Sequence, residues 1–135
     1  MKRSTILSLG VLLLVSLQTM MPLISRGFFP MHDDTQVGRV VAMGRALRQG
    51  QFPVRWVSDL GYGYGYPIFN FYGPLPYYFG GGLYALGFDG LAATKLMFLI
   101  GMLIPVVTMF FFIRYFLGDI PALVGSVLYV YAPYY

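Results

Sequence analysis

Three ionisable side chains follow one another in this chain: His32, Asp33 and Asp34. Carboxylate oxygens are ligands that Mg²⁺ and Mn²⁺ prefer, and these ions commonly also bind a substrate phosphate. Alternatively, one aspartate acts as a general base towards an acceptor hydroxyl, while His32 joins the metal shell or moves a proton. The competing interpretation is that one aspartate caps a helix. We treat Asp33 and Asp34 as candidate catalytic and metal-binding residues, with His32 as a further candidate metal ligand.

Cationic side chains follow this cluster. They are Arg39, Arg45, Arg48 and Arg55. A guanidinium can hold phosphate through two parallel N–H groups, so these four are candidate phosphate-binding residues. Their alternative role is contact with anionic lipid headgroups. Asp59 is either a second carboxylate of the site or the start of a turn.

Glycine, proline and tyrosine dominate residues 61–78, at a density that breaks regular structure. Tyrosine rings in such a loop can stack on a sugar or frame a lipid groove. The candidates for this role are Tyr64, Tyr66, Tyr72 and Tyr77. The alternative is an aromatic belt, because Tyr and Trp settle at headgroup depth.

The element that must position the carboxylates is a helix predicted over residues 33–49. Asp33 or Asp34 is its expected N-cap and Gly50 its expected stop. Its apolar positions at helical spacing are Val37, Val40, Val41, Gly44 and Leu47. We expect the arginines mostly on the other faces, which predicts an amphipathic helix lying along the membrane interface.

Composition places much of the chain in lipid. It is 58% hydrophobic and 10% charged, whereas soluble domains carry about 25% charged residues. It has no cysteine, so no disulfide framework is expected. Residues 4–25 are uncharged and long enough to cross a bilayer; an uncleaved anchor is favoured over a signal peptide.

The predicted fold is an all-α membrane protein whose transmembrane helices flank a long extracytoplasmic first loop. Spans are expected over residues 5–25 and 93–116, with an incomplete third over 120–135, and the loop over 26–91. Residues 1–135 are thus expected to form the N-terminal part of one polytopic membrane domain. We expect a bacterial inner membrane and a cytoplasmic N-terminus, although more Lys and Arg then lie outside than the positive-inside rule favours.

The order of these features resembles the start of C-type (GT-C) membrane glycosyltransferases. More narrowly, residues 32–34, 52–56, 63–67 and 72–77 resemble bacterial membrane proteins labelled "6-pyruvoyl-tetrahydropterin synthase-related". The single histidine excludes the three-histidine zinc site of such a synthase. The resemblance implies sugar transfer from a polyprenyl-phosphate donor on the extracytoplasmic side, with Asp33 or Asp34 as the catalytic or metal-binding carboxylate. It covers most of the chain, yet the family's later spans are absent, so we expect activity in a full-length parent rather than in this chain alone.

The expected partners are membrane lipid and a polyprenyl-phosphate-linked sugar, and the candidate cofactor is Mg²⁺ or Mn²⁺. No motif for nucleic-acid binding is present. The alternative function is a non-enzymatic membrane protein that binds lipid, transports or assists assembly. A transporter would favour ionisable groups within its spans, and residues 4–25 and 96–113 contain none.

Overall fold

The computed structural model describes residues 3–28 and 33–132, and the regular elements in these ranges are all helices. The chain divides into two compact units. One consists of Met1–Arg26 with Leu99–Tyr135, and the other of Gly27–Phe98. We call them the first unit and the second unit. The helical content of both units confirms the prediction of an all-α fold.

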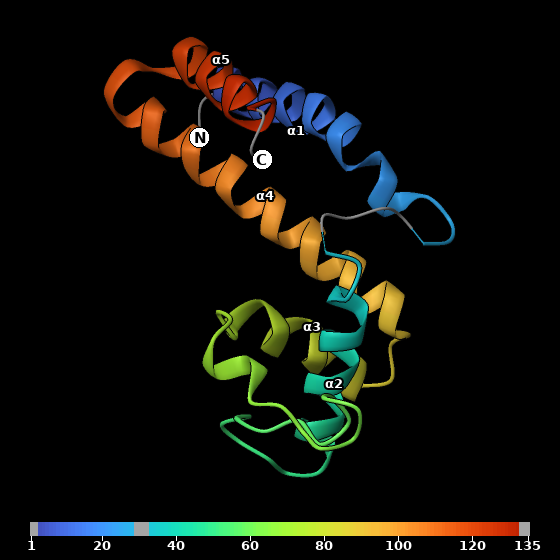
Figure 1. The fold of residues 1–135 in the computed structure, drawn as a ribbon. Helices are drawn as coiled ribbons and strands as arrows, with labels where there is room; N and C mark the ends of the chain where they lie inside the picture. Colours follow the sequence, from blue (N-terminus) through green and yellow to red (C-terminus); the bar gives the residue numbers. More distant parts are fainter. Residues whose placement is uncertain (1–2, 29–32, 133–135) are drawn as a thin grey trace. The chain divides into compact units, whose positions relative to one another are not determined.

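The first unit contains α1 (Arg3–Ile24), the greater part of α4 (Gly90–Leu117) and α5 (Asp119–Val130) (Figure 1). At about 1.5 Å per residue, α1 is about 33 Å long, which matches a hydrocarbon core of about 30 Å. Within the described residues, α1 and α4 are the two helices long and apolar enough to cross a membrane. They coincide with the first two predicted spans. At about 18 Å, α5 is too short to cross alone.

Apolar side chains both join and surround the helices of the first unit. Its buried cluster takes Leu12 from α1, Val106 and Phe110 from α4, and Ala122 and Val130 from α5. Other apolar side chains of the three helices are exposed, among them Leu7, Leu14, Phe112, Ile120 and Leu128. Many exposed apolar side chains on three helices are unfavourable in water and favourable in lipid.

One carboxylate connects the ends of the three helices. Gly118, with φ of +88°, makes the turn between α4 and α5. The carboxylate of Asp119 accepts hydrogen bonds from Ser4 Oγ (2.6 Å) and Thr5 Oγ1 (3.1 Å) and pairs with Arg114 Nε (2.7 Å). Farther along, the Tyr131 hydroxyl donates to the carbonyl of Val15. Thus α1 and α5 run parallel, side by side (Figure 1).

The second unit is built around α2 (Gln36–Arg48) and α3 (Leu75–Ala85), with the short 3-10 helix η1 (Ile68–Asn70) between them in sequence. Its core includes Val40 and Met43 from α2, Phe69 from η1, Tyr77 from α3 and Met97 from α4. The two α-helices pack closely (Figure 1). A Cβ added to Gly44 would lie 2.6 Å from the carbonyl oxygen of Gly81, so this crossing requires glycine.

The predicted N-cap of α2 is wrong, whereas its predicted stop is confirmed. Thr35 is the N-cap residue, and α2 begins at Gln36 because Asp33 and Asp34 lie in the turn before it. At the other end Gly50 has φ of +80° and donates to Leu47 O (2.9 Å), while Gln51 donates to Ala46 O (3.0 Å). This pair of bonds is the Schellman arrangement that glycine favours.

The buried face of α2 also differs from the prediction. Arg39 is buried on it, beside Val40, Ala42, Met43, Gly44 and Ala46. A buried guanidinium is tolerated because charged and aromatic partners surround it, as described below. The apolar face packs against α3 and therefore lies within the second unit. The location of α2 at a membrane interface remains a prediction.

Candidate functional site

A cavity of about 620 Å³ lies within the second unit. It is lined by residues from the start of α2, from residues 57–66, which we call the Gly/Tyr segment, and from η1: Asp34, Thr35, Gly38, Arg39, Leu60, Gly61, Tyr66 and Ile68. We call it the Asp34 cavity. Its volume is within the range of small-molecule sites, about 300–1,000 Å³.

The Gly/Tyr segment forms a closed loop at one side of this cavity. Val57 N donates to Tyr66 O (3.1 Å), and Tyr66 N donates to Val57 O (2.9 Å). Gly65 has φ of +84°, and a Cβ there would collide with the indole ring of Trp56. The glycine at this position therefore lets the loop fold back on Trp56, which brings Gly61 and Tyr66 to the cavity. As predicted, residues 61–67 form neither helix nor extended strand, but the prediction is wrong for residues 68–70, which form η1, and for residues 75–78, which begin α3.

Asp33 has both of its carboxylate oxygens engaged. Its Oδ1 accepts hydrogen bonds from the Thr35 hydroxyl (2.6 Å) and the Thr35 amide (3.2 Å), and its Oδ2 pairs with Arg39 Nη1 at 2.6 Å. The bond from the Thr35 hydroxyl, opposed by burial and aided by the Thr35 amide and Arg39, holds the pKa of Asp33 below its usual 3.8. This carboxylate is therefore ionised and orders the turn before α2.

Arg39 is only 9% exposed, yet it keeps its charge. Burial opposes its charge, but the Tyr77 hydroxyl and then Asp33 outweigh that effect and raise its pKa. Arg39 Nη1 donates to Tyr77 Oη at 3.5 Å, and Tyr77 Oη donates to Gln36 Oε1 at 2.6 Å. The guanidinium carbon lies 4.3 Å from the centre of the Tyr72 ring. These contacts fix the guanidinium position beside the cavity and leave its buried Nε with no acceptor among the described residues.

Asp34 differs from its neighbour. It is exposed, it lines the cavity, and it has no hydrogen bond or ion pair with any described residue. The Asp-Asp pair therefore separates into a carboxylate that holds the local structure and a carboxylate with free oxygen atoms. Of the two predicted catalytic residues, Asp34 is the one available for chemistry.

Of the two carboxylates predicted to bind a metal ion, only Asp34 has oxygen atoms free to do so. Among the described residues no three His, Cys, Asp or Glu side chains form a group that could hold an ion. His32 lies outside the described residues, so its predicted role stays a prediction. Mg²⁺ often takes only one or two carboxylates together with substrate phosphate and water. Asp34 could supply such a ligand, whereas the oxygens of Asp33 are engaged.

Only one of the four predicted phosphate-binding arginines lines the Asp34 cavity. Arg45 Nη1 pairs with Asp59 Oδ2 at 2.7 Å on the surface. Arg48 donates to the carbonyls of Tyr84 (2.7 Å) and Ala85 (3.1 Å), at the C-terminal end of α3. Arg55 lines a different cavity. Arg39 is therefore the candidate phosphate ligand of this site.

Three of the four predicted tyrosines gather around Arg39 and the cavity. Tyr66 lines the cavity, Tyr72 lies under the guanidinium, and Tyr77 bonds to it. Tyr64 is 89% exposed and is not among the lining residues. The structure thus separates Tyr64 from the site.

Sequence reasoning missed several lining residues. Thr35 and Gly38 could have been found, because positions 35, 38 and 39 share one face of a helix. Leu60 lies in the loop that Val57 and Tyr66 close, and Ile68 follows this loop in η1. No local pattern predicts the closure.

Comparison of the chain with protein-family models, with curated proteins and with solved structures finds no match. Its function must therefore be inferred from its own residues and their geometry.

Proposed function

We propose that this chain is embedded in the bacterial inner membrane and that its Asp34 cavity binds a polyprenyl-phosphate-linked sugar for glycosyl transfer on the extracytoplasmic side. The observation that carries the proposal is an unpaired carboxylate, Asp34, lining the same cavity as a rigidly held cation, Arg39. The two apolar helices support the membrane location. The resemblance of the sequence to GT-C transferases supports the choice of reaction.

In the proposed reaction, the Asp34 carboxylate removes the proton from an acceptor hydroxyl. The hydroxyl oxygen bonds to the anomeric carbon as the bond from that carbon to the phosphate oxygen breaks. The polyprenyl phosphate leaves with the electron pair, and Arg39 stabilises its negative charge. A Mg²⁺ or Mn²⁺ ion bound through Asp34 would offset the same phosphate charge.

The test compares two carboxylates in the full-length parent protein that is expected to contain these residues, reconstituted in proteoliposomes. The probe is a polyprenyl-phosphate-linked hexose, radiolabelled in the sugar, supplied with a lipid-linked hydroxyl acceptor. Loss of a general base costs about 10²–10⁴-fold in rate, so we expect Asp34→Asn to lose at least about a hundredfold. The matched control is Asp59→Asn, an exposed carboxylate outside the cavity. Equal transfer by these two variants, or no binding of the probe by the wild-type chain, would refute the proposal.

A second candidate is binding of the lipid-linked sugar without transfer. It is favoured by the remainder of the cavity lining, which contains no ionisable side chain and could contact the ligand only through van der Waals and backbone groups. These residues are Gly38, Leu60, Gly61 and Ile68. In this case the wild-type chain binds the probe without turnover. Asp34→Asn then leaves binding intact, whereas Arg39→Met weakens it.

The predicted side of the membrane can be tested separately. Because the chain has no cysteine, Ser58→Cys introduces a single thiol at an exposed position of the second unit. We expect a membrane-impermeant maleimide to label it in intact spheroplasts. Labelling only after permeabilisation would place this unit in the cytoplasm and overturn the proposed orientation.

A further inference from the structure

The second unit contains another cavity, of about 400 Å³, which the proposed reaction does not use. It is lined by Pro53, Val54, Arg55, Phe69, Asn70, Pro74 and Tyr78. We call it the Arg55 cavity. Helix η1 contributes to both cavities, with Ile68 in the first and Phe69 and Asn70 in the second.

The Arg55 cavity offers hydrogen-bond donors and positive charge. Arg55 is exposed and has no ion pair or hydrogen bond with a described residue, unlike Arg39, Arg45 and Arg48. The Asn70 side chain likewise bonds to none of them. Tyr78 Oη accepts a hydrogen bond from Val54 N (2.8 Å), so its own proton remains available. No carboxylate lines the cavity, and an anionic group is therefore the ligand that fits it.

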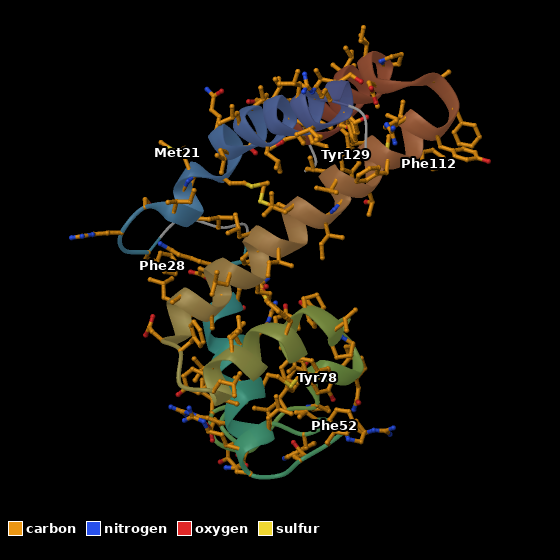
Figure 2. The ribbon with its side chains drawn as sticks, turned by 180° about the vertical axis from the view of Figure 1, so that it is seen from behind. Met21, Phe28, Phe52, Tyr78, Phe112 and Tyr129 are labelled. Carbon is orange, nitrogen blue, oxygen red and sulfur yellow. The ribbon has the colours of Figure 1, made fainter. Side chains whose placement is uncertain are left out.

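Large exposed apolar side chains adjoin these lining residues in sequence. Phe52 and Leu75 are each 79% exposed and Phe71 is 74% exposed, while Trp56 is half-exposed. The Phe52 ring lies 5.5 Å from that of Tyr78, centre to centre; both are labelled in the lower half of Figure 2. Exposed aromatic side chains adjoining an unpaired cation in sequence suit the headgroup region of a bilayer, where rings reach towards the acyl chains and the cation meets phosphate.

We propose that Arg55 and Asn70, with the exposed side chains of Phe52, Trp56, Phe71 and Leu75, form a binding surface for an anionic phospholipid headgroup in the bilayer. The guanidinium donates to the phosphate oxygens, the Asn70 amide adds a donor, and the apolar side chains enter the interfacial layer. The inference rests on the proposed membrane location and is independent of glycosyl transfer.

The single tryptophan of the chain, Trp56, adjoins Arg55 and serves as the reporter. The full chain is placed in nanodiscs of phosphatidylcholine and phosphatidylglycerol, with bromine on the acyl chains of one lipid at a time. One cationic contact at a membrane surface is worth about 1 kcal/mol, or about a fivefold enrichment of anionic lipid. We expect brominated phosphatidylglycerol to quench Trp56 more strongly than brominated phosphatidylcholine at equal mole fraction.

The variants decide which residue causes the preference. Arg55→Gln should abolish it, whereas Arg45→Gln, which removes an exposed arginine already paired with Asp59, should preserve it. Equal quenching by the two lipids in the wild-type chain, or an unchanged preference in Arg55→Gln, overturns the proposal. So does a shift of Trp56 emission by millimolar inorganic phosphate in detergent, which would identify a soluble anion as the ligand.

One control separates this proposal from the membrane location itself. Membranes carrying the chain are first washed at alkaline pH. Release of the chain would refute the membrane location, and the headgroup inference with it. Retention of the chain without a headgroup preference would refute the headgroup inference alone, and neither result depends on transferase activity.

Discussion

The contact between α2 and α3 predicts opposite effects for two neighbouring glycines of α3. A Cβ added to Gly81 would lie 2.5 Å from Met43 Cγ, 2.8 Å from Met43 Cβ and 2.9 Å from Gly44 N. Carbon atoms in good contact are about 3.5–4.0 Å apart, so the helices must separate by about 1 Å. A Cβ added to Gly82 meets nothing within 4 Å. Only Gly81→Ala should therefore disturb the packing.

The magnitudes follow from two effects. Overpacking costs about 1–3 kcal/mol, and the upper value applies because the backbone of α2 cannot give way as a flexible side chain would. Replacing a helical glycine with alanine stabilises by about 1 kcal/mol at either position. We expect Gly81→Ala to lower the free energy of unfolding by about 2 kcal/mol and Gly82→Ala to raise it by about 1 kcal/mol.

The assay is thermal unfolding of the full chain in detergent, followed through Trp56, which lies in the second unit. For a domain of 60–100 residues, 1 kcal/mol shifts Tm by about 4–8 °C. Gly81→Ala should thus lower Tm by about 8–16 °C, and Gly82→Ala should raise it by about 4–8 °C. A Gly81→Ala chain as stable as the wild type, or equal losses in both variants, would show that the two helices do not pack as described.

Two further predictions concern the contacts of Arg39. Tyr77→Phe removes the hydroxyl that donates to Gln36 and accepts from Arg39. We therefore expect the free energy of unfolding to fall by about 1 kcal/mol in the same assay. Tyr64→Phe, which alters an exposed ring outside the site, should leave it unchanged. Asp33 predicts a pH dependence: because its folded pKa lies below 3.8, its contribution to stability is present above that value and is lost as the pH falls through the folded pKa. Tm measured from pH 5 to 3 should therefore fall less for Asp33→Asn than for the wild type, and equal slopes would contradict the Asp33–Arg39 pairing.

The sequence predicted the elements whose signals are local. Long apolar runs predicted α1 and α4, and Gly50 predicted the end of α2, where the backbone has a positive φ. Helical periodicity predicted α2. These signals work because each depends on residues a few positions apart.

What the sequence left open depends on contacts between distant residues. The burial of Arg39 requires Tyr77, 38 positions away, and its charge alone favoured a solvent-facing position. The difference between Asp33 and Asp34 depends on which of them reaches Arg39 and Thr35. The Asp34 cavity is completed by the loop that Val57 and Tyr66 close. No single segment contains this information.

The carboxylate of Asp119 has a consequence for how the chain threads into a bilayer. Its donors come from the beginning of α1 and the end of α4, so in a bilayer these two ends must emerge on the same side. An insertion that reversed α1 alone would leave Asp119 without its Ser4 and Thr5 donors. The loss of hydrogen bonds to a charged group costs about 1.5–3 kcal/mol each. Incorrect topologies are thereby disfavoured. A reporter fused before α1 and a reporter inserted between α4 and α5 should therefore register the same compartment.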